Sequence, residues 1–333
     1  MVQFDERRTR EQIPVHAVGA AYPMATLERE EARAHALIDG STRNVPTPAL
    51  KVLDAISRRW LAQQDSVHLD EIDAIARRLA RPGAYFLSVN YEWGCTCKVA
   101  PAPDHGSARL VRVLDWQMPG LGRHVVAARV AGAAGPFATL TWPGYTGILQ
   151  AIAPARFAAA LNQAPMRKPI GAFYLDWAVN RARVWRMPHL TPAHLLREVF
   201  ETAPTFAEAK RMLTERPIST PAIFSLAGTK PAEAAIIERT ETEARVHEGS
   251  NVTANHWQAP GWRGHPRGSN SAGRAHQMHA VSTELDPTFR WLAPPILNRN
   301  TRLVMVADAA QGRLVVQGFE EQRAATEPLE LVF

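Results

Sequence analysis

Two groups of short strand-like segments, separated by a pair of capped helices, constrain the fold of this 333-residue chain most strongly. The segments are rich in β-branched and aromatic residues, and Gly or Pro residues separate them, which is typical of strands joined by turns. The expected strands cover residues 85–91, 95–100, 108–116, 125–130, 137–142, 222–226, 234–239, 244–247 and 252–255, followed by a hairpin of 302–307 with 313–318.

Helix signals lie between the two groups of strands. Thr191 and Pro192 have the pattern of an N-cap followed by a first-turn proline, and Thr205 with Glu208 forms a capping-box pattern. Antiparallel strands in two runs, with helices between them, favour an α+β layered sandwich in which sheet packs on sheet and helices lie outside.

Three further segments give weaker signals. Residues 283–291 are expected to be helical, residues 155–161 fit either a strand or a helix, and residues 261–274 are expected to form the least regular loop.

The N-terminal part of the chain is expected to be helical. Apolar residues recur at helical spacing over 49–62 and 69–79, and a charged helical stretch covers 27–37. The apolar faces that include Trp60 and Leu61 are expected to pack on the core, and a transient contact with a membrane surface is the alternative.

Composition excludes several classes of protein. The net charge is +6 and the pI about 9.7, but the arginines are scattered, so no nucleic-acid partner is expected. No apolar run is long enough to span a membrane, and the first residues lack the apolar region of a signal peptide, which indicates a cytoplasmic protein. Two cysteines form no disulfide framework.

No cofactor and no metal site are expected. The four histidines that invite a metal interpretation lie in irregular sequence without the spacing of helical metal ligands: His256, His265, His276 and His279.

The Gly94-Cys95 pair marks the strongest candidate for chemistry. If the bond between the two residues were cut, Cys95 would carry both a thiol nucleophile and a free α-amine, whose reference pKa of about 7.7–8.0 suits a general base. The alternative is that Cys95, like most cysteines in apolar surroundings, is a small buried hydrophobe. Cys97 lies two residues further on and is the competing candidate nucleophile.

Several segments, taken in order, resemble the acid ceramidase and N-acylethanolamine amidase group, which is similar to the choloylglycine hydrolases. The matching blocks are Cys95-Thr96-Cys97-Lys98-Val99-Ala100, preceded by residues 85–92, then Arg112-Val113-Leu114-Asp115-Trp116, Gly144-Tyr145-Thr146-Gly147-Ile148, Leu161-Asn162-Gln163, and Asn251-Val252-Thr253-Ala254-Asn255 followed by Arg274. Each block alone is weak, but their order is specific and covers most of the chain from residue 50 onward.

The resemblance implies a four-layer αββα sandwich of the N-terminal nucleophile hydrolase type, with a helical N-terminal segment. It also implies self-cleavage at Gly94-Cys95, which leaves residues 1–94 and 95–333 associated as an αβ heterodimer. The absence of a signal peptide and of disulfides fits a bacterial relative.

The resemblance further assigns the residues of the site. Cys95 would be the nucleophile, flanked by Arg112 and Asp115, while Asn255 would supply an oxyanion donor and Arg274 would be the second arginine of the pocket. Substrate contacts fall to Gln163, Trp116 and Tyr145. If the resemblance is set aside, other interpretations hold for these residues. Arg112 and Asp115 would form a structural ion pair, Asn255 would be a strand asparagine with its hydrogen bonds satisfied, and Arg274 would be a surface residue.

The expected activity is hydrolysis of a linear N-acyl amide, such as a fatty-acyl amide or a ceramide-like molecule. The alternatives are an acyltransferase of the isopenicillin-N type, a penicillin or bile-acid amide hydrolase, and a non-catalytic lipid-binding protein on the same scaffold.

Overall fold

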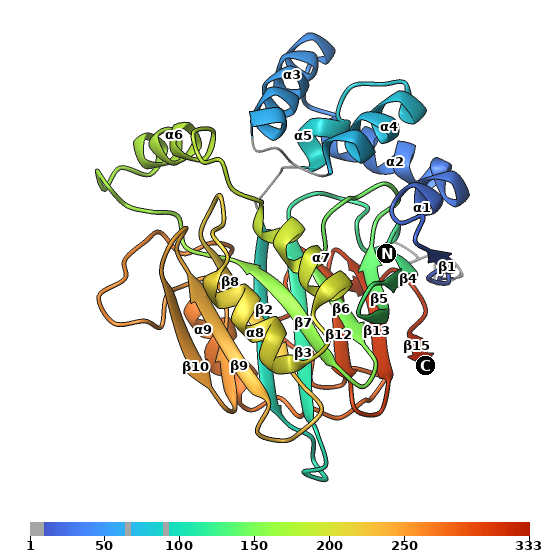
Figure 1. The fold of residues 1–333 in the computed structure, drawn as a ribbon, viewed down its shortest axis with the longest axis vertical. Coiled ribbons are helices and arrows are strands. Elements are labelled where there is room, and N and C mark those ends of the chain that lie inside the picture. The colour runs from blue at the N-terminus through green and yellow to red at the C-terminus, as the bar shows by residue number, and fades with distance from the viewer. Residues whose placement is uncertain (1–9, 64–67, 89–92) are drawn as a thin grey trace, which may run out of the picture.

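The computed structural model describes residues 10–63, 68–88 and 93–333. Two β-sheets pack face to face, helices cover their outer faces, and a further group of helices lies over one end of the sandwich (Figure 1). The predicted α+β sandwich is confirmed.

The larger sheet contains eight strands among the described residues, in the order β1-β4-β5-β6-β7-β8-β9-β10. Among the described strand pairs of this sheet, only β1–β4 is parallel. The strands are β1 (Val15–Gly19), β4 (Val126–Gly132), β5 (Gly135–Thr141), β6 (Gln150–Ala153), β7 (Phe157–Gln163), β8 (Ala222–Ala227), β9 (Ala234–Arg239) and β10 (Ala244–Glu248).

The smaller sheet has the order β11-β2-β3-β12-β13-β14, and β15 also pairs with β13. Its strands are β2 (Trp93–Pro101), β3 (Ala108–Trp116), β11 (Asn251–Thr253), β12 (Thr301–Asp308), β13 (Arg313–Glu320), β14 (Arg323–Ala324) and β15 (Leu329–Val332). β2 and β3 form a continuous antiparallel ladder in which Gly94 lies opposite Asp115 and Cys97 opposite Arg112. This ladder carries most of the predicted site.

Side chains alternate between the two faces of β3, as a pleated strand requires. Leu110 and Leu114 belong to the core between the two sheets, whereas Val111 and Val113 pack in the core under α9 (Ser271–His279). On the opposite outer face, α7 (Pro192–Thr202) and α8 (Phe206–Glu215) cover the larger sheet. The layers are therefore helix, sheet, sheet, helix.

Thr191 and Thr205 act as the predicted N-caps, because their hydroxyls accept from the backbone N–H groups of His194 and Glu208. The capped helix α7 then places Phe200 against Phe137 and Phe157 of the larger sheet, with ring centroids 5.5 and 5.0 Å apart.

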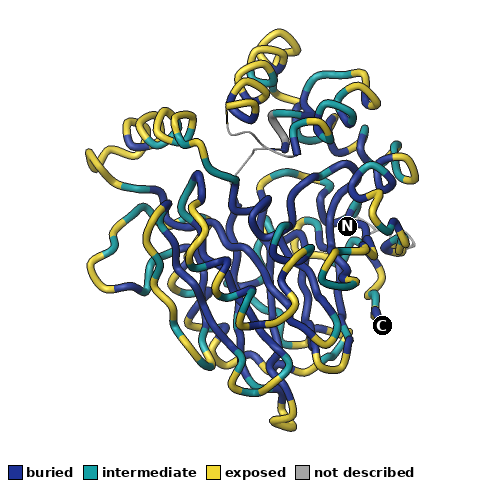
Figure 2. Tube along the Cα trace, in the orientation of Figure 1, coloured by how far each residue is buried: buried dark blue, intermediate teal, exposed yellow. Residues whose placement is uncertain are grey.

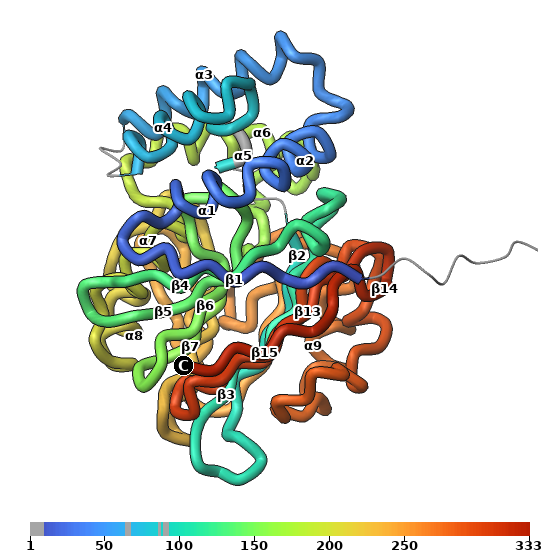
Figure 3. Tube along the Cα trace, turned by 90° about the vertical axis from the view of Figure 1, so that its right-hand side faces the viewer, coloured from blue at the N-terminus to red at the C-terminus, as the bar shows by residue number. Residues whose placement is uncertain are grey.

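The N-terminal helices sit over the end of the sandwich at which β2 begins (Figures 1 and 3). They are α1 (Met24–Arg29), α2 (Glu31–Thr42), α3 (Thr47–Gln63), α4 (Leu69–Leu79) and α5 (Ala84–Ser88). Trp60 and Leu61 are buried in a cluster with Ile72, which confirms the core interpretation of that face. No described helix is both long and apolar enough to cross a bilayer.

Three expectations about local structure are wrong, and one segment that was left open is settled. Residues 85–88 belong to the helix α5 rather than to a strand, and residues 89–91 of that expected strand lie outside the described part of the chain. The ambiguous segment is strand β7 from Phe157 onward.

The expected helix at 283–291 is absent from the described structure. The Asp286 carboxylate instead accepts from the backbone and hydroxyl of Thr288, which forms a local turn, and Phe289 has a left-handed φ of 47°. The expected loop conversely contains the start of α9, because the Asn270 side chain caps the N–H of Gly273.

Helix α6 (Phe173–Val184) was not expected from the sequence, since its apolar residues point largely to solvent. Tyr174 is 84% exposed and Leu175 56% exposed, and Figure 2 shows this projecting helix as mostly exposed beside a buried sandwich. Apolar residues at helical spacing indicate a helix when they form one buried face, so this criterion does not identify a helix whose apolar residues are exposed.

The N-terminal helices are attached to the sandwich by a polar contact between α4 and α7. Arg197 donates to both carboxylate oxygens of Glu71, at 2.6 and 2.9 Å. Beside this ion pair, the rings of His68 and His194 stack with centroids 4.5 Å apart, and His194 Nε2 lies 2.9 Å from the Thr146 hydroxyl. Burial, with smaller effects of His68 and Arg197, lowers the pKa of His194 well below its ordinary value of 6.5.

This contact predicts an acid-sensitive attachment of the helices. Unfolding frees His194 to bind a proton that the folded chain excludes, so its contribution to stability is present above about pH 6.5 and is lost as the pH falls below that value. The unfolding temperature of the wild type should therefore fall more steeply between pH 7.5 and pH 5 than that of His194→Gln. His35→Gln, which changes a partly exposed histidine on α2 outside this contact, is the comparison variant. Equal slopes for wild type and His194→Gln would remove His194 from the effect.

Candidate active site

Cys95 and Cys97 lie on the inner face of β2, and both are fully buried. They point to the same side because they are two residues apart on a strand. The guanidinium of Arg112, from the neighbouring strand β3, lies against both sulfurs: Nη2 is 3.2 Å from Cys95 Sγ and Nη1 is 3.6 Å from Cys97 Sγ. One arginine thus faces the two candidate nucleophiles.

Two amide side chains hold Arg112 in this position. Its Nε donates to Gln150 Oε1 and its Nη1 to Asn162 Oδ1, each at 2.9 Å. Asn162 Oδ1 also accepts from the Cys97 thiol at 3.1 Å. Arg112 forms no ion pair with Asp115 here, so the structural-pair alternative for these two residues is wrong.

Asn255 and Arg274 surround the backbone of Cys95. The amide N–H of Cys95 donates to Asn255 Oδ1 at 2.7 Å, and Asn255 Nδ2 donates to the Gln163 carbonyl at 2.7 Å. Arg274 Nη1 donates to the Cys95 carbonyl at 2.6 Å, and Nη2 donates to Asn255 Oδ1 at 2.9 Å. Arg274 is fully buried, so the interpretation of this arginine as a surface residue is wrong.

The Asp115 carboxylate lies beside this group and is bound by residues other than Cys95. It accepts from Asn298 Nδ2 and the Thr301 hydroxyl, both at 2.9 Å, and lies 3.5 Å from Arg274 Nη1. Burial raises the pKa of Asp115, while Arg274, Asn298 and Thr301 oppose that rise. The group opposite Cys95 N is therefore Asn255, and Asp115 acts on the site through Arg274.

Burial also controls the thiols. It raises the pKa of Cys95 to about 12, and the charge of Arg112 only partly offsets this effect. The pKa of Cys97 is raised for the same reason. Both cysteines are therefore neutral thiols near pH 7, and both are closed off from solvent in this structure.

The backbone on the other side of Cys95 requires two glycines. A Cβ on Gly268, whose φ is +67°, would lie 2.9 Å from Arg274 Nη2 and 3.2 Å from the Cα of Gly94. A Cβ on Gly94 would likewise lie 3.3 Å from Gly268 Cα. The close approach of these two glycines lets the loop before α9 close over the Gly94-Cys95 bond.

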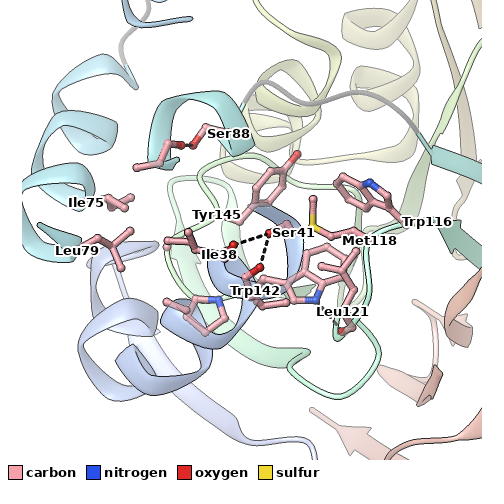
Figure 4. Close-up of a pocket in the computed structure, with 15 residues that line it drawn as sticks. Ile38, Ser41, Ile75, Leu79, Ser88, Trp116, Met118, Leu121, Trp142 and Tyr145 are labelled. Carbon is pink, nitrogen blue, oxygen red and sulfur yellow. Dashed lines mark hydrogen bonds between the residues drawn. The ribbon is translucent and has the colours of Figure 1, made fainter. Parts of the chain in front are cut away.

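The three predicted substrate contacts line two different cavities. Trp116 and Tyr145 line an apolar cavity between α2, α4 and the end of β3, shown in Figure 4 with Ile38, Ile75 and Leu79 of the N-terminal helices. Gln163 lines a second cavity between α3 and α6. Its Oε1 accepts a hydrogen bond from the backbone N–H of Trp93 at 2.9 Å. Trp93 stacks on Trp116 at 4.9 Å, so Trp93 connects the Gln163 side to the apolar cavity.

Sequence reasoning missed the residues that support the site rather than form it. These are Gln150, Asn162, Asn298, Thr301 and Gly268. Two of them could have been found from the sequence. Asn162 adjoins Gln163 in a matching block, and Gln150 is a polar residue directly after a buried apolar pair. Among the described residues, no group of three or more His, Cys, Asp or Glu side chains is arranged to hold a metal ion.

Comparison with known proteins shows which sequences and folds this chain resembles. No family model matches the chain. Over 111 residues, 32% of its length, the chain is 32% identical to acid ceramidase of Homo sapiens and 31% identical to that of Mus musculus. The match spans about a quarter of the length of these curated relatives, 26%.

The solved structures show the fold. An N-acylethanolamine-hydrolyzing acid amidase ortholog from Caenorhabditis elegans superposes with a TM-score of 0.51, covering 65% of this chain and 93% of that one at 20% identity. The chain has the two-sheet α+β sandwich of the N-terminal nucleophile hydrolases. Over the 111 matched residues its sequence is similar to that of the acid ceramidases, which confirms the resemblance predicted from the ordered motifs.

The Gly94–Gly268 contact predicts a specific sensitivity. Gly268→Ala should destabilise the chain by about 1–3 kcal/mol more than Gly261→Ala, because the new methyl group displaces Arg274. Gly261 is a matched control: its φ is +83°, so alanine meets the same backbone strain, but nothing lies within 4 Å of its Cβ position. Urea unfolding of both variants measures the difference. Equal losses of unfolding free energy in the two variants would show that the loop adjusts without displacing Arg274.

Proposed function

We propose that the chain is an amidohydrolase that cleaves a linear N-acyl amide with an N-terminal cysteine nucleophile. The observation that carries this proposal is the set of contacts around one residue: Arg112 at the sulfur of Cys95, Asn255 at its nitrogen and Arg274 at its carbonyl. The sequence relationship to acid ceramidases supports the reaction class.

In the proposed maturation, the chain cleaves itself between Gly94 and Cys95. The Cys95 thiol attacks the Gly94 carbonyl carbon, the C–N bond breaks as the nitrogen takes up a proton, and a thioester forms. Water then hydrolyses the thioester to the Gly94 carboxylate, the free thiol and the free α-amine. The Glu71–Arg197 ion pair supports the continued association of residues 1–94 with 95–333 as an αβ heterodimer.

In the proposed turnover, the α-amine of Cys95 takes the thiol proton and the thiolate attacks the amide carbonyl of the substrate. The α-amine returns the proton to the leaving amine, and water releases the acyl group from sulfur. Arg112 stabilises the thiolate. Asn255 Oδ1 already accepts from Cys95 N, so we propose that it orients the α-amine, while the second N–H of its Nδ2 serves the oxyanion.

The alternatives use the same scaffold. An acyltransferase of the isopenicillin-N type, or a penicillin or bile-acid amide hydrolase, would share the maturation step and differ in substrate. A non-catalytic lipid-binding protein would keep an intact chain with an inert Cys95.

The maturation proposal predicts that purified wild-type protein consists of two fragments, 1–94 and 95–333. Cys95→Ala should remain intact, because the attacking thiol is gone, and Cys97→Ser should be cleaved and keep most activity. Intact-mass measurement and denaturing electrophoresis show whether each variant is one chain or two fragments. Active wild-type protein with an unbroken chain would disprove the mechanism, and an inactive Cys97→Ser beside an active Cys95→Ser would identify Cys97 as the nucleophile.

The apolar cavity predicts a preference for long acyl chains. Turnover of a series of N-acyl ethanolamides should rise with acyl length, because each buried methylene contributes about 0.8 kcal/mol. Ser41→Leu, which narrows the cavity from α2, should shift the optimum to shorter chains, and Ser41→Ala should not. Best turnover of penicillin V or glycocholate, with long chains untouched, would favour the alternative substrates. Transfer of the acyl group to an added amine would favour the acyltransferase.

A further inference from the structure

Arg112 carries a buried positive charge that only neutral groups contact. Its guanidinium donates to Gln150 Oε1 and Asn162 Oδ1 and lies against the sulfurs of Cys95 and Cys97. Among the residues that the structure describes, no carboxylate forms an ion pair with it. Burying a charge is costly unless hydrogen bonds or an opposite charge compensate it. Here hydrogen bonds and two thiols hold the guanidinium without a counter-ion.

Two other buried arginines of the same region do have a carboxylate. Arg109 lies on the same strand as Arg112, and its Nε donates to the Asp308 carboxylate at 2.7 Å. Arg274 lies 3.5 Å from the carboxylate of Asp115. The fold therefore does place acids beside buried arginines, and it places amides beside Arg112 instead.

A buried arginine without an acid can also be purely structural, as Arg239 shows. Its guanidinium donates to the backbone carbonyls of Leu213 and Arg216 at the end of α8. Such carbonyls carry the partial negative charge of a helix C-terminus. Arg112 differs from Arg239 because its free side faces two thiols, each of which becomes an anion when it loses its proton.

The two amides that hold Arg112 are themselves fixed in orientation. Gln150 on β6 donates from Nε2 to the Leu140 carbonyl at 2.5 Å, so its Oε1 faces the guanidinium. Asn162 on β7 donates from Nδ2 to the Ala254 carbonyl at 3.2 Å, so its Oδ1 does the same. Both side chains are fully buried. Neither amide can therefore turn its nitrogen to Arg112 without losing a hydrogen bond.

The same contacts distinguish the two sulfurs. The Cys97 thiol donates to Asn162 Oδ1 at 3.1 Å, so its proton is held by a good acceptor. The Cys95 thiol has only a longer contact of 3.9 Å with the Leu161 carbonyl, and it is the sulfur nearer to Arg112. The positive charge thus lies closest to the sulfur whose proton is held less firmly.

We propose that Gln150 and Asn162 are positioning residues whose neutrality reserves the charge of Arg112 for the thiolate of Cys95. This inference rests on the proposed amidohydrolase function and names two residues that act on the reaction only through Arg112. An acid in either position would hold the guanidinium as an amide does. Its negative charge, however, would oppose a second anion at Cys95.

The test compares two substitutions of Gln150 that both lose the hydrogen bond to Leu140. Gln150→Met also loses the acceptor for Arg112, whereas Gln150→Glu keeps that acceptor and adds a negative charge. In urea unfolding, Gln150→Glu should be the more stable of the two, because its carboxylate pairs with the buried guanidinium.

Activity should give the opposite order. With N-octanoyl ethanolamine, and counted per cleaved chain by intact mass, kcat should fall about tenfold in Gln150→Met and about a hundredfold in Gln150→Glu. KM should stay within about twofold of the wild type in both variants, because Gln150 contacts Arg112 and not the substrate.

The pH profile gives a readout that a structural role would not change. The acid limb of kcat/KM, where Cys95 and its α-amine gain protons, should move up by about one pH unit in Gln150→Glu and by less in Gln150→Met. The other titratable or charged groups near this sulfur, besides Arg112, are Cys97 of β2, Asp115 of β3 and Arg274 of α9. Both variants keep all of them, so they do not account for a difference.

Gln317→Glu is the matched control for a new buried carboxylate. Gln317 is a buried residue of β13, three strands from β2, and its Nε2 also donates to a backbone carbonyl, that of Thr326 at 2.9 Å. The acid limb of this variant should stay in place. An equal shift in Gln317→Glu would assign the effect to charge in general and would overturn the inference.

Two further outcomes separate this inference from the proposed function. If activity follows the same order as stability in an active enzyme, Gln150 is merely structural and the inference fails, while the proposed hydrolysis stands. An intact and inactive wild type would overturn both. If the Gln150 variants do not fold, Asn162→Leu and Asn162→Asp test the same reversal at the second amide.

Discussion

The buried guanidinium of Arg274 is the interaction on which the arrangement of the site depends. It donates to the Cys95 carbonyl, the Thr96 hydroxyl, Asn255 Oδ1 and the carbonyls of Ser269 and Arg267. Burying a charged group is costly unless it is paired and hydrogen-bonded, and here Asp115 at 3.5 Å supplies the opposite charge. One side chain therefore joins β2, the residues after β11, α9 and the loop before it around the Gly94-Cys95 bond.

The sequence predicted much of this arrangement, because strands with one buried face repeat with a period of two and helix caps have clear side-chain signals. β3 and α4 were expected with the bounds that the structure gives, and the five proposed catalytic residues converge on one point. Their convergence could be expected only from the order of the family blocks, since Cys95 and Arg274 are far apart in the chain. The roles of these residues stay predictions.

The remaining features depended on tertiary contacts that local patterns do not encode. α9 begins where Asn270 caps it, in a stretch rich in Gly and Ser that favours a loop when considered alone. α6 presents apolar residues to solvent, so its pattern did not indicate a buried face. The partners of Arg112 come from β6 and β7, and only the pairing of two sheets brings Gln150 and Asn162 to its guanidinium. Two cavities, rather than one, follow from the packing of the helices over the end of the sandwich.

The complete burial of Cys95 also bears on quality control in the cell. The groups around Cys95 come together only when β2, β3, the residues after β11 and α9 have all assembled, because each contributes one of them. If the proposed self-cleavage occurs, a misassembled chain would lack the arrangement that breaks its own backbone. Such a chain would remain uncleaved and inactive rather than become a poorly selective catalyst. Self-cleavage would then act as a check on folding, because the broken Gly94-Cys95 bond would mark the chains that had assembled correctly.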